Sequence, residues 1–536
     1  MKYYSFFYGI LLSCFLPAAA LACTNLLVTR SASADGSTMI SYLADSHVLY
    51  GELYYWPAQD HAEGSMRDIY EWDTDKRLGK IKEAKHTYQV IGNMNEFQLV
   101  IGETTFGGRK EITQDTNAIM DYGSLIYVTL QRTRTAREAI AMMAELVAEY
   151  GYYSSGESFS IADPDEVWLM EMIGKGPGNK GAVWVALKVP DGYISAHANQ
   201  SRIGKFPLKD KANCLYSKDV ITYARSRGFF KGKDEDFSFA DAYAPMDFHA
   251  QRFCEARVWS IFRRAAPSLN LTPELVDGSN LSARLPLWIK PDKPISMKDA
   301  FSLMRDHFEG TPFDMTKDPG AEPFGLPYRW RPLSWKIDST SCFNERAIST
   351  QQTGFSFVSQ SRRQLPDAIG GVLWFGVDDN YSTVYSPFYC CSREVSRNYA
   401  QGNGDLYHYS PDAAFWVFNK VSNFAYLRYN YMITDIQKAQ QSLEDSALMR
   451  QPSIEAEAMK LYKTDPNKAI ESLTRYSVSA ADAVVKRWQL LFEELMVKYI
   501  DGNIKSAPGK LEQPGYSEYW YRSIIEETGN KFKAPY

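Results

Sequence analysis

Short runs of apolar and β-branched residues, separated by turn residues, dominate the first 200 positions. The run from Thr24 to Thr29 precedes Asp35-Gly36-Ser37, and a second run extends from Thr38 to Leu43. Two β-prone runs on either side of a turn that contains glycine are typical of a β-hairpin. The sequence therefore predicts a pair of strands over these two runs.

Seven further β-like runs continue this pattern at close spacing. They cover residues 52–56, 87–91, 98–102, 158–162, 167–172, 183–189 and 193–196. Such spacing favours antiparallel sheets over units in which a helix joins two parallel strands. Between these runs, Thr135-Ala136-Arg137-Glu138 is a capping box that predicts an amphipathic helix to about Tyr150, with Gly151 placed to end it. Strands, helices and strands in this order predict an α+β layered domain.

The remaining chain favours helices. The predicted helices cover residues 255–265, 297–308, 413–446, 453–462 and 467–499, and residues 347–377 form a β-like block. Ser296 and Asp299 can cap the second of these helices. The segment Gly310–Trp335 is rich in proline, glycine and aromatic residues, so it is predicted to be a long ordered loop and a candidate pocket wall.

The amino terminus has the three parts of a secretory signal. Lys2 precedes an apolar stretch from Ser5 to Leu16, and the small residues Ala20 and Ala22 precede Cys23. The stretch is shorter than the roughly 20 residues of a membrane-spanning helix, and no later segment has that character. We therefore expect residues 1–22 to be a signal peptide, cleavage before Cys23, and export to the periplasm or beyond the cell.

Composition narrows the function classes. A hydrophobic fraction of 45% and a formal net charge of −5 describe a globular protein without a broad basic surface for nucleic acid. Six of the seven cysteines remain after the expected cut, which is compatible with one or two disulfides. The seven histidines show no HExxH pattern, and CxxC pairs, a serine-nucleophile elbow and a phosphate loop are absent from the sequence. A metal site therefore has little support.

Cleavage before Cys23 would place a thiol and a free α-amino group on one residue. The amine has a reference pKa of about 7.7–8.0, so it is partly neutral near pH 7 and can accept the thiol proton without a histidine. Attack of the sulfur on an amide carbonyl would give an acyl-enzyme that water hydrolyses. The sequence thus indicates an amidohydrolase with a cysteine as its N-terminal nucleophile.

Three other interpretations of Cys23 stay open. It could be a small buried residue near the start of a strand, as most lone cysteines are. A lipid-modified Cys23 would anchor a surface binding protein, although Leu21 stands one position too late for the usual lipoprotein signal and strand-like residues follow in place of a tether. Cleavage within Ala18–Ala20 would leave Cys23 internal.

A series of specific strings carries a resemblance to a known family. The strings cover residues 23–29, 34–38, 95–96, 101–106, 131–140 and 189–200. In this order they resemble the cysteine-type dipeptidase A family of the N-terminal-nucleophile hydrolase superfamily, with weaker similarity at 257–259 and 333–387. The resemblance implies a four-layer αββα N-terminal-nucleophile sandwich, cleavage of short peptides, and no metal or organic cofactor. We predict a hydrolase domain over residues 23–430, followed by additional C-terminal helices in an extension over 431–536.

The resemblance also implies roles for three catalytic residues. Cys23 matches the nucleophile, Asp45 matches an acidic residue that orients the terminal ammonium, and Asn199 matches an amide of the oxyanion hole. A neutral donor aimed at developing negative charge is what acyl transfer requires. Without the resemblance, Asp45 would be interpreted as a turn aspartate and Asn199 as a loop asparagine.

Glu103 and Thr105 are the candidate substrate-binding residues. Thr105 stands where the related choloylglycine hydrolases and penicillin V acylases carry an oxyanion asparagine, and Tyr42 about where they carry an arginine. Both differences argue against bile-salt or penicillin substrates. Glu103 could bind a substrate ammonium or pair with a buried base, and His197 could be a hydrogen-bonded histidine of the sheet.

The leading hypothesis is an exported cysteine dipeptidase that hydrolyses short peptides. An amidase or acylase of related fold and a lipid-anchored surface binding protein are the alternatives. Side-chain preference and assembly into a homo-oligomer are left open by the sequence.

Overall fold

The first sheet contains both strands of the predicted amino-terminal hairpin. The computed structural model describes residues 23–46, 48–112, 115–330 and 333–536, so the predicted signal peptide lies outside the described residues. β1 (Asn25–Val28) and β2 (Met39–Asp45) pair antiparallel, with Leu27 opposite Ile40, which confirms the hairpin. The order in this seven-stranded sheet is β16-β14-β1-β2-β19-β20-β21. Its other strands are β14 (Ile194–His197), β16 (Trp288–Ile289), β19 (Thr353–Gln360), β20 (Val372–Val377) and β21 (Ser386–Tyr389).

The second sheet collects the strands predicted between residues 52 and 189. Its eight strands have the order β15-β13-β12-β11-β10-β9-β8-β3, and neighbours run antiparallel. The bounds are β3 (Tyr55–Trp56), β8 (Val90–Ile91), β9 (Met94–Asn95), β10 (Val100–Phe106), β11 (Gly156–Ala162), β12 (Val167–Gly174), β13 (Ala182–Lys188) and β15 (Cys214–Tyr216). The antiparallel arrangement confirms the prediction from strand spacing, whereas β9 and β15 were not predicted.

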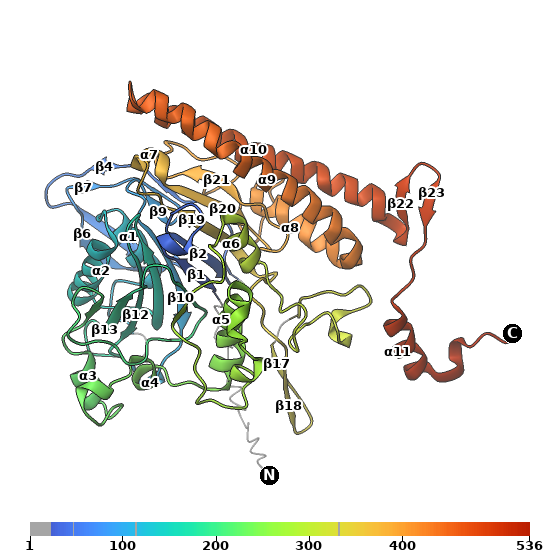
Figure 1. The fold of residues 1–536 in the computed structure, drawn as a ribbon, viewed down its shortest axis with the longest axis horizontal. Helices are drawn as coiled ribbons and strands as arrows, with labels where there is room; N and C mark the ends of the chain where they lie inside the picture. The colour runs from blue at the N-terminus through green and yellow to red at the C-terminus, as the bar shows by residue number, and fades with distance from the viewer. Residues whose placement is uncertain (1–22, 47, 113–114, 331–332) are drawn as a thin grey trace, which may run out of the picture.

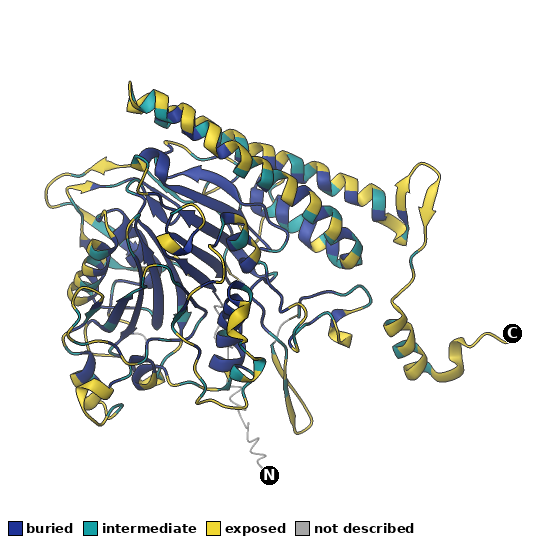
Figure 2. Ribbon diagram, in the orientation of Figure 1, coloured by how far each residue is buried: buried dark blue, intermediate teal, exposed yellow. Residues whose placement is uncertain are grey.

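The two sheets pack face to face, and helices lie on their outer faces (Figure 1). Ile40 of β2 and Val100 of β10 belong to one buried apolar cluster between the sheets. α1 (Tyr122–Leu130) and α2 (Ala136–Tyr150) pack on the eight-stranded sheet, while α5 (Ala256–Ala265) and α6 (Met297–Met304) pack on the other. Figure 2 shows the buried residues concentrated within these layers. The structure confirms a mixed α+β fold with antiparallel sheets.

The sequence predicted capping residues for α2 and α6, and in the structure these residues lie where both helices begin. The Thr135 hydroxyl accepts a hydrogen bond from the N–H of Glu138, and Gly151 follows α2 with a φ of 80°. Ser296 and Asp299 form a complete capping box on α6. α6 ends at Met304, four residues earlier than predicted, because Arg305 leaves the helical conformation and binds Glu444.

Long helices form the carboxy-terminal part of the molecule, as predicted. They are α8 (Ala414–Ala425), α9 (Tyr429–Tyr462) and α10 (Pro466–Tyr499). α9 continues through Pro452, where the sequence predicted a break. On either side of this proline, Gln451 and Glu455 are buried, and Glu455 pairs with Arg362 at 2.6 Å. Tertiary packing therefore overrides the local preference of proline.

Two elements near the carboxy terminus were not predicted. They are a hairpin of β22 (Ile504–Ala507) and β23 (Lys510–Glu512), and α11 (Glu518–Thr528), which Figure 1 shows apart from the body. The described part of Gly310–Trp335 is mainly irregular, with a short 3-10 turn at Pro319–Ala321 and the start of β17 (Ser334–Ile337). No helix among the described residues has both the length and the apolar character to cross a membrane.

Candidate active site

Cys23 lies immediately before β1 and is buried, with 4% of its surface exposed. Its Sγ is 3.9 Å from Oε1 of Glu103, and the backbone N–H of Asp45 donates to the sulfur. The next residue, Thr24, is fixed by two backbone hydrogen bonds to Leu43 on β2. Burial, followed by the nearby charges of Glu103 and Asp45, raises the pKa of the thiol well above its usual range. The sulfur is thus held in place and protonated.

Asp45 stands at the end of β2 and is fully buried beside Cys23. Its Oδ2 accepts from the Arg346 guanidinium at 2.6 Å, and its Oδ1 accepts from the Thr353 hydroxyl at 2.6 Å. Burial raises the pKa of Asp45, and the Arg346 charge and the Thr353 hydrogen bond partly offset that rise. The structure therefore brings the predicted Asp45 to the nucleophile and holds it with a cation that the sequence did not indicate.

Arg257, on α5, connects Cys23 to Asn199. Its Nη1 donates to the backbone oxygen of Cys23 at 2.6 Å and to Oγ1 of Thr24 at 2.8 Å. Its Nη2 donates to Oδ1 of Asn199 at 2.8 Å. Burial and the Arg346 charge lower the pKa of Arg257 to about 10, so it stays a cation at neutral pH. Sequence reasoning gave this residue no role.

Asn199 has a conformation that few residue types tolerate. Its φ is 59°, in the left-handed region that asparagine adopts more readily than most other residues. Arg257 holds the amide oxygen, and Nδ2 donates to the backbone oxygen of Thr105 at 2.7 Å. Because an amide nitrogen carries two hydrogens, Nδ2 keeps one for another acceptor. This geometry suits the predicted oxyanion donor.

Glu103, on β10, contacts the sulfur of Cys23, whereas Arg257 contacts its backbone oxygen. Its Oε1 accepts from the Tyr42 hydroxyl at 2.5 Å, in addition to the contact with the thiol. Thr105 follows two residues later on the same strand and pairs with Glu157 of β11. The structure thus brings all five predicted site residues into one region, and adds Tyr42, Glu157, Arg257 and Arg346 to them.

His197 is buried near this cluster but both of its ring nitrogens have partners. Nδ1 is 2.7 Å from Oγ1 of Thr104, and Nε2 is 2.7 Å from Oγ of Ser160. Burial and the charge of Arg202 lower the pKa of His197 to about 3. It is the hydrogen-bonded sheet histidine that the sequence allowed, and it does not contact Cys23.

Two cavities flank the cluster. One, of about 330 Å³, is lined by Asn199, Arg257 and Arg346, and also by Leu333 from the predicted wall segment. The other, of about 130 Å³, is lined by Thr105 and Glu157 and lies on the acidic side. Each is small enough to suit a ligand of few atoms.

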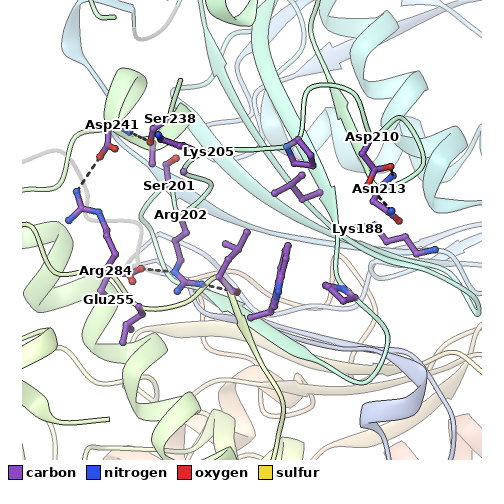
Figure 3. A pocket seen from close by; sticks show the side chains of 18 of the residues that line it. Lys188, Ser201, Arg202, Lys205, Asp210, Asn213, Ser238, Asp241, Glu255 and Arg284 are labelled. Carbon is purple, nitrogen blue, oxygen red and sulfur yellow. Dashed lines mark hydrogen bonds and ion pairs between the residues drawn. The ribbon is translucent and has the colours of Figure 1, made fainter. Parts of the chain in front are cut away.

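The largest cavity, about 890 Å³, is built differently (Figure 3). Its basic lining residues are paired, with Arg202–Glu255 at 2.9 Å and Arg284–Asp241 at 3.2 Å as two of the ion pairs. Lys188 and Lys205 are likewise paired, with Glu166 and Asp236. Each basic side chain of this lining is therefore neutralised by a carboxylate, whereas Asp191 and Asp210 accept hydrogen bonds from uncharged donors.

The described residues contain neither a disulfide nor a cluster of potential metal ligands. The six described cysteines are all unbridged, so the disulfides that the sequence allowed are not formed. Within the described ranges, no three His, Cys, Asp or Glu side chains lie close enough together to hold a metal ion.

Comparison with known protein families defines the class of this protein. The model of peptidase family C69 matches residues 22–442, most of the chain, so the protein is a peptidase and thus a hydrolase. More specifically, the chain belongs to peptidase family C69, the dipeptidase A family.

Curated relatives agree with this assignment. The chain is 23% identical over 503 residues to the probable dipeptidase B of Streptococcus pyogenes serotype M1, covering 91% of this chain and 95% of that protein. It is 25% identical over 401 residues to the probable dipeptidase of Salmonella dublin, covering 72% and 83%. The probable dipeptidase of Latilactobacillus sakei is 24% identical over 398 residues, covering 71% and 76%.

Proposed function

We propose that this chain is an exported cysteine dipeptidase of the N-terminal-nucleophile class, with Cys23 as the nucleophile once cleavage has made it the first residue. Family membership supplies the peptidase class, and the relatives favour dipeptides as substrates. The observation that carries the proposal is the convergence of Asp45, Arg257 and Asn199 on Cys23. The helix-covered pair of antiparallel sheets supports the N-terminal-nucleophile sandwich.

The identity of the general base follows from the contacts of the thiol. Among the described residues, Cys23 Sγ contacts Glu103 Oε1 and the backbone N–H of Asp45, and no histidine hydrogen-bonds it. His197 is already hydrogen-bonded through both nitrogens. The α-amine that cleavage would create on Cys23 is therefore the best candidate to accept the thiol proton. Asp45, held by Arg346 and Thr353, would orient the resulting ammonium.

The reaction then proceeds in two stages. Cys23 Sγ attacks the scissile carbonyl carbon while its proton moves to the α-amine, and the negative charge on the carbonyl oxygen is stabilised by the free hydrogen of Asn199 Nδ2. Collapse of the tetrahedral intermediate breaks the C–N bond, and the leaving amine takes the proton from the ammonium. Water next attacks the thioester with the amine as base, which releases the acid and restores the thiol.

Burial of the thiol explains why cleavage would matter. With residues 1–22 attached, the nitrogen of Cys23 is an amide and cannot accept a proton near neutral pH. The raised pKa of the thiol then keeps the sulfur protonated. A free amine at this position would supply the missing base.

The experiment compares two purified proteins that differ by one residue at the amino terminus. One begins with Cys23, and the other begins with an added alanine before Cys23. We expect the added alanine to lower kcat for a dipeptide by on the order of 10³-fold or more, close to the effect of removing the thiol. Near-normal hydrolysis by the extended protein would overturn the N-terminal-nucleophile mechanism.

Two further measurements separate the alternatives. The mass of the mature protein should correspond to a chain that begins with unmodified Cys23, whereas an added lipid mass would indicate an anchored binding protein. Dipeptides should be cleaved much faster than N-acyl amino acids and faster than decapeptides, because the two cavities that flank the cluster are small. Preference for an N-acyl amino acid would indicate an acylase.

A further inference from the structure

The smaller of the two cavities, at Thr105 and Glu157, has a strongly acidic lining. Four carboxylates contribute to its wall, and the lining contains no lysine or arginine among the described residues. These acidic residues are Glu71, Asp73, Asp121 and Glu157. Such a concentration of one charge in about 130 Å³ repels itself unless a cation enters.

Glu157 and Glu103 lack the partners that buried carboxylates normally have. Each is only 1% exposed, the two carboxyl groups hydrogen-bond each other, and Oε2 of each has no cationic or amide donor among the described residues. An isolated buried carboxylate carries a large desolvation cost, so proteins usually pair it.

Four other buried carboxylates of this protein are paired with an arginine. Asp45 pairs with Arg346, Glu255 with Arg202, Glu444 with Arg305 and Glu455 with Arg362. The Oε2 atoms of Glu103 and Glu157, which lack such a cation, mark a place where a cationic ligand would be stabilised.

The two glutamates behave as an interacting pair. Burial raises the pKa of Glu103 to about 7, and burial together with the Glu103 charge raises the pKa of Glu157 well above its usual range. Near pH 7 the pair therefore holds at least one proton and keeps negative charge for a cation. Asp73, whose pKa burial raises to about 6, adds a further negative charge nearby.

We propose that Glu103, Glu157 and the acidic cavity bind the free α-ammonium of the peptide substrate and so select substrates with an unblocked amino terminus. This inference rests on the proposed function, because it takes Cys23 as the attacking group. A donor set with a metal ion's requirements is not formed here, since no three such side chains of the described residues lie close enough together. An ammonium, with three N–H donors, matches two carboxylates that lack a cationic partner.

Distances around Cys23 fit this role. Sγ and Oε1 of Glu103 are 3.9 Å apart. In a peptide, the α-nitrogen lies about 2.5 Å from the carbonyl carbon of the same residue. A carbon placed about 3–3.5 Å from the sulfur for attack can therefore have its ammonium about 2.7–3.2 Å from a Glu103 oxygen. A residue placed ahead of that nitrogen would extend into the acidic cavity and remove the positive charge.

The first test compares a dipeptide with its desamino analogue, which has the same amide bond but a hydrogen in place of the α-amine. We expect the protein that begins at Cys23 to hydrolyse the analogue with a kcat/KM about 10- to 100-fold lower, the effect of losing a charge-assisted hydrogen bond. Equal hydrolysis of the two compounds would overturn the ammonium site. Hydrolysis of neither would instead count against the proposed dipeptidase function.

The second test uses Glu157→Gln, which keeps the shape of the side chain and removes its charge. The dipeptide should lose about 10-fold or more in kcat/KM, mostly through KM, while the desamino analogue changes little. Glu149→Gln, on the exposed face of α2, is the matched control and should alter neither substrate. An equal loss for both substrates would mean that Glu157 has only a structural role.

Binding provides a readout that does not depend on turnover. A Cys23→Ala protein titrated in a calorimeter with the dipeptide and with its desamino analogue should bind the dipeptide at least about 10-fold more tightly. The added Glu157→Gln change should remove most of that difference. Equal affinities in the Cys23→Ala protein would refute the ammonium site even if the enzyme hydrolyses dipeptides.

Discussion

The two sides of Cys23 differ in the sign of their charge and in how that charge is satisfied. On one side, Arg257 and Arg346 are held by Asn199, Asp45 and backbone oxygens. On the other, Glu103 and Glu157 each retain a buried oxygen without a cationic or amide donor among the described residues. The charged groups that are paired within the protein hold the nucleophile and its neighbours in place. The carboxylates without a cationic partner are available to bind a ligand.

Residues that position the nucleophile therefore differ from residues that bind the substrate. A side chain whose hydrogen bonds are complete can hold another residue in place, but it has little left to offer a substrate. Asn199 combines both properties, because its oxygen is held by Arg257 while Nδ2 keeps one hydrogen. The division predicts which substitutions should alter turnover and which should alter substrate affinity.

Removing the sulfur of Cys23 should have the largest effect on turnover. Cys23→Ala is expected to lower kcat by on the order of 10⁴-fold or more, since no other described nucleophile occupies its position. The loss should occur with little change in melting temperature, because only one buried sulfur is removed. Cys214→Ala, at a buried cysteine on β15, is the control and should stay active. An active Cys23→Ala protein would show that Cys23 is not the nucleophile.

On the cationic side, the expected effect is in turnover. Asn199→Asp keeps the size of the side chain but replaces its donor with a carboxylate, so kcat should fall by about 10²- to 10³-fold with KM nearly unchanged. Steady-state kinetics with one dipeptide measures both. Asn270→Asp, at an exposed position that also has a positive φ (47°), controls for the backbone conformation. A change confined to KM would place Asn199 in substrate binding instead.

On the acidic side, the free protein should gain stability when a charge is removed. The pKa of Glu103 is raised from 4.5 to about 7, so the favourable protonated state is fully present below pH 4.5 and is lost as pH rises through 7. Glu157→Gln removes the cost of keeping a buried carboxyl group protonated beside this charge, and should be more stable than the unaltered protein by about 1 kcal/mol at pH 8.

Thermal unfolding at several pH values measures this difference. The advantage of Glu157→Gln should shrink as pH falls from 8 toward 4.5, whereas Glu149→Gln should show no such trend. If the unaltered protein is the more stable one at pH 8, a cation within the chain already satisfies the pair and the contrast between the two sides is wrong.

The smallest effect is expected at an ion pair that lines neither of the two smaller cavities. Arg284 pairs with Asp241 at 3.2 Å on the wall of the largest cavity, and both side chains are substantially exposed. Arg284→Ala should therefore change stability by less than about 1 kcal/mol and leave kcat/KM for dipeptides within about twofold. A large rise in KM would relocate substrate binding to the cavity of Figure 3.

Local sequence patterns predicted the parts of the fold that depend on neighbouring residues. The turn at Asp35-Gly36-Ser37 and the runs beside it were enough to predict β1 and β2, and Thr135 with Gly151 bounded α2. α9 shows the limit of this approach, since the sequence predicted a break over residues 447–452, where the packing of Glu455 against Arg362 accompanies a continuous helix. Such contacts join residues that are far apart in sequence.

The site was predicted unevenly for the same reason. Cys23 was predicted from the expected signal-peptide cleavage and from resemblance, Asp45 and Asn199 from resemblance alone, and the structure brings the three together. Arg257 was missed because its helix also carries Arg263 and Arg264, and only tertiary packing directs Arg257 toward Cys23 while the other two pair with Asp306.

The sequence contains only a weak indication that Glu157 is part of the site. It is an acidic residue inside a strand of small and apolar residues, Gly156–Ala162, every one of which is buried. A carboxylate at such a position is costly, and that cost could have singled it out. Its relation to Glu103 could not have been predicted, because it depends on the register of β10 against β11.

The attachment of Cys23 on its carboxyl side bears on how an active enzyme would arise. Arg257 donates a hydrogen bond to the backbone oxygen of Cys23, and Thr24 exchanges backbone hydrogen bonds with Leu43. Cys23 is therefore held in place by the part of the chain that cleavage would leave intact. Maturation would then need no refolding, and the new terminus would start in its working orientation. Little conformational entropy would remain to be lost when substrate arrives.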